Sequence, residues 1–246
     1  MSGDSAFLAA EVDSVPYRAV ARLDDLSPRL PDFALIGGLA VIIRLGQAHR
    51  ATNDVDTVSD DQAGLLDVLV ADGLDRQGDS VLLEADLTLD VIDVSEGDVE
   101  YLPYATHRFA FDTRAPVEVV VRPRGGGAAV AVTVDVARAS ALVAVKLGLS
   151  EGVGRQRDPR KMGSDAFDVA RLLQRFGPDM LADELIALAE PGFVDRVRDL
   201  AERHLIDNVD RTAAAIVRSS VQGVETIAVE QLELLGRALT RRLRRG

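Results

Sequence analysis

Two aspartates stand two residues apart in the segment NDVDTV, at positions 53–58. The segment alternates polar and apolar residues, which is the pattern of a half-buried strand. Residues i and i+2 of a strand lie on one face, about 7 Å apart along the backbone. We therefore expect Asp54 and Asp56 to lie side by side, with Val55 in the core. A divalent cation bound by both carboxylates would remove their mutual repulsion; the alternative is a solvated strand edge that binds nothing.

A third carboxylate belongs to the segment LTLDVIDV, at positions 87–94, which is also typical of a strand. This segment offers two candidates on opposite faces, Asp90 and Asp93. With Asp90 beside the first pair, two adjacent strands would supply three carboxylates to one or two Mg²⁺ (or Mn²⁺) ions. Mg²⁺ at phosphoryl-transfer sites is commonly held by a few oxygen ligands, with positions left for phosphate oxygens and water.

The pair Gly37-Gly38 supplies another part of such a site. It stands between the strand-like run DFALI and the run LAVIIRL, which is apolar enough for a short buried helix. Glycines let the backbone approach a phosphate, and a helix N-terminus offers N–H groups to it. Arg50 and Thr52 come just before the aspartates. An anion-binding loop, a basic residue and paired aspartates are what the chemistry of a nucleoside triphosphate (NTP) needs.

The segment IGGLAVIIRLGQAHRATNDVDTV, residues 36–58, resembles the core motif of the nucleotidyltransferase (polymerase-β-like) superfamily. That motif is an apolar residue with Gly and Gly or Ser, a short helix, and then Asp-apolar-Asp or Asp-apolar-Glu on a strand. The form Arg-x-Thr-x-Asp-apolar-Asp is similar to the AbiEii abortive-infection toxins and the related MenT-type toxins. The third carboxylate of that family follows a segment like LTL, which favours Asp90 over Asp93.

Residues 140–173 resemble the second signature of that family, a helix with a lysine, an arginine-bearing loop and a helix with Asp-x-x-Asp. Lys146 matches the signature lysine, and Asp165 and Asp168 match the aspartates. The resemblance covers roughly residues 33–175, and the helices beyond it match no known motif.

The second signature departs from the family pattern at two points. Ser164 stands where the family often has a lysine, and Lys161 lies four residues before Asp165. Either Arg155 or Arg157 fills the arginine position of the loop. The simpler readings are a surface lysine at position 146, whose charged end reaches water, and aspartates that favour a helix start through the helix dipole.

The resemblance implies Mg-dependent transfer of a nucleoside monophosphate from an NTP to an acceptor hydroxyl. The catalytic residues it implies are Asp54, Asp56, Asp90, Lys146 and Asp165, with metal on the first three. The nucleotide-binding residues are Gly37, Gly38, Arg50 and Thr52. The implied acceptor is the 3′ end of tRNA, with a cognate antitoxin as a protein partner. The residues leave open a small-molecule or protein acceptor, and an inactive binding module.

The elements that must position these residues predict an α+β protein. Residues 28–136 are expected to form a nucleotidyltransferase-like mixed sheet with flanking helices, and residues 137–246 a helical domain. The run VEVVVRPRGGGAAVAVTV predicts a hairpin around a glycine turn. Glycines and prolines, Gly163 among them, are expected to separate the later helices. The first 27 residues carry no clear signal.

Composition limits the function classes. The chain has 246 residues, a formal net charge of −12, three histidines and no cysteine. Thiolate or imidazole zinc sites are therefore not expected, and binding to nucleic acid would need a local basic patch. Two basic clusters exist, at 155–161 and in the last ten residues; each is either an RNA contact or a solvated surface. Without a signal-like or membrane-spanning run, we expect a cytoplasmic protein with no membrane partner.

Overall fold

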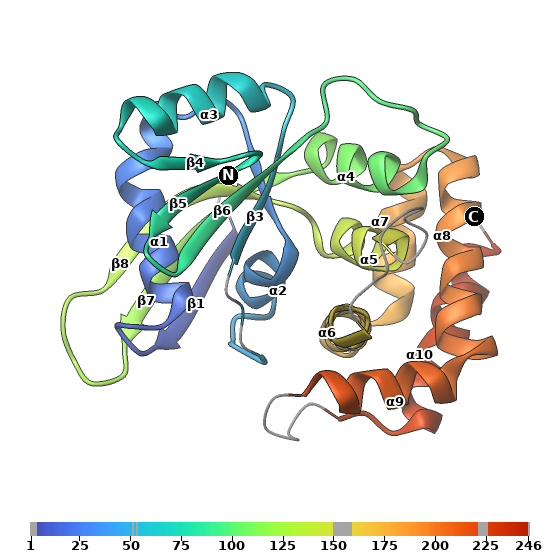
Figure 1. The fold of residues 1–246 in the computed structure, drawn as a ribbon. Helices are drawn as coiled ribbons and strands as arrows, with labels where there is room; N and C mark the ends of the chain where they lie inside the picture. Colours follow the sequence, from blue (N-terminus) through green and yellow to red (C-terminus); the bar gives the residue numbers. More distant parts are fainter. Residues whose placement is uncertain (1–3, 51, 53, 150–158, 221–225, 246) are drawn as a thin grey trace. The chain divides into compact units, whose positions relative to one another are not determined.

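The computed structural model describes residues 4–50, 52, 54–149, 159–220 and 226–245. The chain is an α+β protein that divides into two compact units (Figure 1). The sheet unit comprises Met1–Asp98 and Ala110–Arg138, and the helical unit comprises Val99–Phe109 and Ala139–Gly246. The division differs from the expected one at 136/137 in two ways. Residues 1–27 belong to the sheet unit, and residues 99–109 belong to the helical unit.

One mixed sheet of eight strands forms the centre of the sheet unit, in the order β1-β7-β8-β2-β3-β6-β5-β4. The strands are β1 (Asp4–Ala10), β2 (Ala34–Ile36), β3 (Asp54–Ser59), β4 (Asp75–Gln77), β5 (Ser80–Glu84), β6 (Leu87–Asp93), β7 (Ala115–Pro123) and β8 (Val130–Val136). Strand β3 runs parallel to β6 and antiparallel to β2. The two expected carboxylate-bearing strands are therefore neighbours in the middle of the sheet.

The helices of the sheet unit are α1 (Val15–Leu26), a short 3₁₀ turn (Ser27–Arg29), α2 (Gly37–Leu45) and α3 (Gln62–Ala71). Helix α1 packs on β7 and β8, and α3 packs on β3, β5 and β6. Helix α3 is capped by the Asp61 side chain, which accepts a hydrogen bond from the Gly64 N–H. The expected hairpin is confirmed, since β7 and β8 pair antiparallel on either side of the glycine run.

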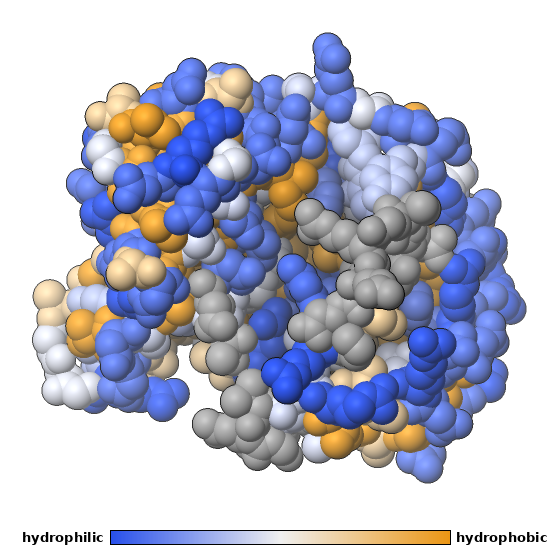
Figure 2. Space-filling model, viewed as in Figure 1, coloured by the Kyte–Doolittle hydropathy of each residue, from blue (hydrophilic) through white to orange (hydrophobic). Residues whose placement is uncertain are grey.

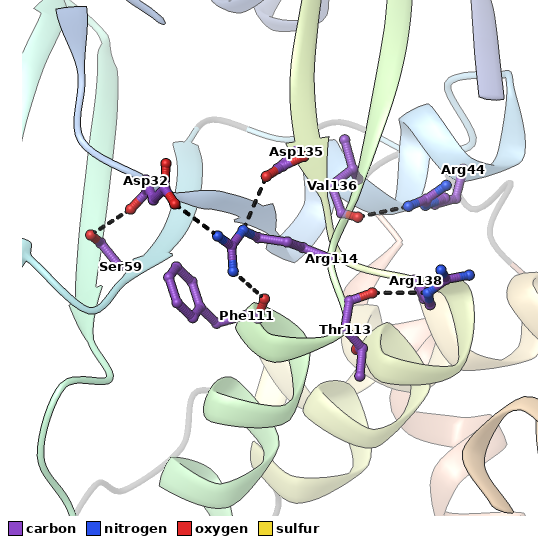
Figure 3. Close-up of polar contacts among 9 residues, drawn as sticks. All are labelled: Asp32, Arg44, Ser59, Phe111, Thr113, Arg114, Asp135, Val136 and Arg138. Carbon is purple, nitrogen blue, oxygen red and sulfur yellow. Dashed lines mark hydrogen bonds and ion pairs between the residues drawn. The ribbon is translucent and has the colours of Figure 1, made fainter. Parts of the chain in front are cut away.

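Arg114 ties together three parts of the sheet unit (Figure 3). Its guanidinium donates to Asp32, Asp135 and the carbonyl oxygen of Phe111, at 3.1, 3.0 and 2.8 Å respectively. The Ser59 hydroxyl, at the end of β3, donates to the Asp32 carbonyl oxygen at 2.8 Å. These contacts fix the loop before β2 against the ends of β3 and β8.

The helical unit contains α5 (Ala139–Gly148), α6 (Pro159–Phe176), α7 (Pro178–Leu188), α8 (Pro191–Glu202), a π-helical segment η3 (Arg203–Asp207), α9 (Val209–Ser219) and α10 (Val229–Leu243). Helix α4 (Leu102–Asp112) carries the boundary, with its residues up to Phe109 in this unit. The expectation that Gly163 separates two helices is wrong, because it lies inside α6. A Cβ at Gly163 would lie 2.1 Å from the Ala215 carbonyl oxygen. The glycine therefore lets α9 pack closely on α6.

Hydrophilic side chains cover most of the face shown in Figure 2, with apolar ones in smaller groups between them. Within the described residues, no helix has both the length and the apolar character that a bilayer crossing requires.

Candidate functional site

Three carboxylates of the sheet unit come together as expected. Asp56 on β3 is the direct neighbour of Asp90 on the parallel strand β6, and Asp54 lies two residues before Asp56 on the same face. One oxygen from each of the three side chains lies within 4.8 Å of the others. All three residues are half-buried, so the cluster is reachable from solvent.

Asp93 does not belong to this cluster. It is the neighbour of Ser59 in the strand pairing and lies an odd number of residues after Asp90, which places it on the other face of β6. Its side chain is exposed and accepts a hydrogen bond from the Ser95 N–H at 2.8 Å. The register therefore selects Asp90, and Asp93 has a local role at the end of the strand.

Gly37 is the point where β2 ends and α2 begins. Its φ of +65° is in the left-handed region, which side chains rarely adopt. A Cβ at this position would lie 1.8 Å from Asp56 Oδ2. Glycine is thus required because the Asp56 carboxylate occupies the space where a side chain would be.

Gly38 is covered in a similar way by the two residues that precede the aspartates. A Cβ there would lie 2.8 Å from both Arg50 Nη2 and Thr52 Oγ1. Thr52 is buried, and its hydroxyl donates to Asp54 Oδ1 at 3.1 Å. The structure therefore brings the four predicted nucleotide-binding residues (Gly37, Gly38, Arg50 and Thr52) together with the carboxylates.

Positive potential from the start of α2 partly offsets the repulsion within the carboxylate cluster, and the Arg50 guanidinium lies beside Gly38 at the same helix start. The first N–H groups of a helix carry a partial positive charge, and Asp56 lies against the first residue of α2. An all-oxygen set of three carboxylates is the donor chemistry that hard divalent cations prefer, so these residues fit Mg²⁺ or Mn²⁺.

Lys146 and the two aspartates of the second signature form a buried cluster inside the helical unit. Lys146 Nζ lies 2.7 Å from Asp165 Oδ1 and 3.0 Å from Asp168 Oδ2. The three residues are only 6%, 3% and 0% exposed, respectively. Neither simpler reading holds, because the lysine does not reach the surface and the aspartates are buried. The cluster connects α5 to α6, and a catalytic role for Lys146 and Asp165 stays a prediction.

His107 on α4 lies near this cluster and is also buried. Desolvation, with a smaller contribution from the charge of Lys146, lowers the pKa of His107 from 6.5 to about 4. His107 is therefore neutral at pH 7, which avoids placing a second positive charge beside Lys146.

The two basic clusters of the sequence have different outcomes. Arg155 and Arg157 lie outside the described residues. In the C-terminal cluster, three arginines form ion pairs, namely Arg237 with Glu233, Arg242 with Asp183 and Arg244 with Glu202. These pairs favour a structural role for that part of the chain over contact with RNA.

A cavity of about 490 Å³ in the helical unit, not expected from the sequence, is lined in part by Arg203, Arg211 and Arg218. The spacing of these arginines, eight and then seven residues, is close to two helical turns each time. That periodicity is the signal that could have placed them on one face.

No family model matches the chain, and comparison with curated proteins and with solved structures finds no match. The functional interpretation therefore depends on the geometry of the residues themselves.

Proposed function

We propose that the chain is a metal-dependent nucleotidyltransferase, with a nucleotidyltransferase-like sheet unit. One observation carries the proposal: Asp54, Asp56 and Asp90 converge within 4.8 Å from two adjacent strands, beside the glycine that begins α2. Half-buried carboxylates in such a group repel one another. Three carboxylates at one place, with a positive-φ glycine beneath one of them, are consistent with a bound cation.

Each residue of the cluster has a role in this proposal. Asp54 and Asp56 would hold Mg²⁺ or Mn²⁺ together with Asp90, and the bound cation would supply charge neutralisation for the triphosphate and acidify the attacking hydroxyl. The Thr52 hydroxyl orients Asp54 through its hydrogen bond. Asp90, on the strand next to Asp56, would accept the proton of the acceptor hydroxyl.

The α2 N-terminus and Arg50 would bind the NTP phosphates, because both present positive charge at the carboxylate cluster. In the reaction, the acceptor oxygen forms a bond to the α-phosphorus while the bond from that phosphorus to the bridging oxygen breaks. Pyrophosphate leaves with the electron pair of that bond, and the proton passes from the hydroxyl to Asp90 and then to solvent. By resemblance to the AbiEii and MenT-type toxins, the proposed acceptor is the 3′ end of tRNA, and an antitoxin is the proposed protein partner.

The test is transfer of label from each of the four α-³²P NTPs into total RNA and into total protein, with Mg²⁺ present. Asp90→Asn and Asp56→Asn remove one charge each without changing side-chain size. Asp93→Asn is the matched control, since Asp93 lies on the same strand as Asp90 but on the other face. Loss of several kcal/mol of charge stabilisation predicts at least about 100-fold lower transfer in the first two variants and near-normal transfer in the third.

The acceptor follows from the labelled fraction. Label in RNA would support RNA as the acceptor, as in the toxins that the sequence resembles. Label in protein alone would indicate an enzyme that modifies proteins. Pyrophosphate release in a metabolite extract would indicate a small-molecule acceptor. Absence of all three signals, or equal activity of Asp90→Asn and Asp93→Asn, rejects nucleotidyl transfer at this cluster.

A further inference from the structure

The helical unit contains a cavity whose charge is opposite to that of the whole protein. Its volume is about 490 Å³, within the range of small-molecule sites. Four cationic side chains line it, Lys146, Arg203, Arg211 and Arg218, against the single carboxylate of Asp165. The chain as a whole has a net charge of −12. Such a concentration of positive charge in an acidic protein indicates an anionic ligand.

The charge of the cavity comes mainly from its arginines. Lys146 is bound to Asp165 and Asp168, so its charge is already balanced. In contrast, Arg211 and Arg218 are exposed, and neither forms an ion pair within the described part of the chain. Exposed arginines of this kind are available to bind phosphate oxygens with two parallel hydrogen bonds each.

The wall that carries these arginines is held in place by its own hydrogen bonds. Arg203 begins the π-helical segment η3. In a π-helix the backbone hydrogen bonds join residues five apart instead of the four of an α-helix. The Asn208 side chain donates to the Arg203 carbonyl oxygen at 2.8 Å. The Thr212 hydroxyl donates to the His204 carbonyl oxygen at 2.7 Å. The backbone that carries Arg203 and Arg211 is therefore held in place before a ligand binds, which lowers the entropic cost of binding.

The remainder of the lining is mostly apolar and comes from several helices, with His204, Asn208 and Thr212 as its polar members. Leu147, Met162, Val169 and Ala215 contribute to it. An anion without an apolar part, such as inorganic phosphate, would leave this surface unused. A nucleotide has both parts, with a phosphate for the arginines and a base that can pack against the aliphatic side chains.

We propose that this cavity binds one nucleotide unit, with its phosphate on Arg203, Arg211 and Arg218 and its base against the apolar lining. The unit is either a free nucleotide or one residue of a single-stranded RNA, since both present the same chemistry. The proposal uses residues of the helical unit alone and holds whether or not the carboxylate cluster is catalytic.

The experiment measures binding of AMP and of a twelve-nucleotide single-stranded RNA by calorimetry, on the full chain in EDTA. EDTA removes binding that requires a cation at the carboxylates, so the result does not depend on nucleotidyl transfer. The variant Arg211→Gln/Arg218→Gln removes the two arginines of the cavity that form no ion pair among the described residues. The control Arg241→Gln/Arg245→Gln makes the same change in net charge at two exposed arginines near the C-terminus, which also tests the C-terminal basic cluster.

We expect AMP, RNA or both to bind the wild-type chain, at least about tenfold more weakly to Arg211→Gln/Arg218→Gln, and with unchanged affinity to the control. Binding of AMP identifies a free nucleotide as sufficient, and binding of RNA alone identifies a strand as the ligand. Three results would overturn the proposal: no binding of either probe, unchanged binding by the cavity variant, or equal weakening in both variants.

Discussion

Gly37 lies directly against the carboxylate of Asp56, and a Cβ at position 37 would lie 1.8 Å from Asp56 Oδ2. The relationship changes the role expected of the glycine pair. The sequence predicts that the glycines let a phosphate approach, whereas Gly37 also makes room for a protein carboxylate. Because Gly37 is the first residue of α2, its contact with Asp56 places that carboxylate at the positive end of the helix.

We predict that Gly37→Ala weakens divalent-cation binding at the carboxylate cluster. The added methyl group overlaps the Asp56 carboxylate and must displace it. Gly46→Ala is a matched control, since Gly46 has a similar φ of +70° and no atom within 4 Å of an added Cβ. Each variant should lose about 1 kcal/mol of stability from backbone strain. Titration with Mn²⁺ should show weaker binding for Gly37→Ala only, and equal Mn²⁺ binding by both variants would contradict the predicted role of Gly37.

Lys146 is predicted to be necessary for the stability of the helical unit. Lys146→Met leaves Asp165 and Asp168 buried together without a cation, which should cost about 3–5 kcal/mol. Lys161 is the chain's other lysine and is exposed, so Lys161→Met should change stability by less than about 0.5 kcal/mol. Thermal unfolding followed by circular dichroism compares the two. Similar midpoints for both variants would show that the buried cluster contributes little.

Local patterns in the sequence predict the elements that bear the carboxylates. The alternation in 53–58 gives β3, and the i, i+2 spacing of Asp54 and Asp56 places them on one face. Two strands, β1 and β4, depend on the strand beside which they pair and not on their own sequence pattern. β1 forms an edge of the sheet by pairing with β7, and β4, whose residues are all exposed, is a strand only because it pairs with β5. Neither has enough local apolar periodicity to be predicted alone.

The same distinction applies to the candidate site. The choice of Asp90 over Asp93 depended on resemblance, since only the register of β3 against β6 determines which face meets Asp56. The burial of Lys146 follows from its pairing with Asp165, 19 residues later. The spacing of the cavity arginines indicates one helix face, but the cavity also needs α5 and α6 on its other side, and their packing depends on contacts far along the chain. Contacts of this range are outside what periodicity can specify.

The depressed pKa of His107 predicts a loss of stability on acidification. The unfolded chain binds a proton at His107 near pH 6.5, whereas the folded protein does so only near its pKa of about 4. Stability should therefore fall as the pH decreases from about 6.5 to 4, by at most about 3 kcal/mol from this group, and change no further below that range. In His107→Leu that contribution is absent, while the carboxylates titrate as before. Urea unfolding of both proteins at pH 4 and 7 measures the difference, and parallel pH dependence would show that His107 is not the cause.

Gly163→Ala is predicted to separate α6 from α9. The new methyl group would lie 2.1 Å from the Ala215 carbonyl oxygen, and a backbone atom cannot move aside as a flexible side chain can. Overpacking of this kind typically costs about 1–3 kcal/mol. Gly192→Ala on α8 provides the control, because an added Cβ there meets no atom within 4 Å and alanine favours a helix. Urea unfolding should show Gly163→Ala destabilised and Gly192→Ala unchanged or slightly stabilised. Since α6 and α9 both line the arginine cavity, Gly163→Ala should also weaken AMP binding there, and unchanged stability would refute the close contact between the two helices.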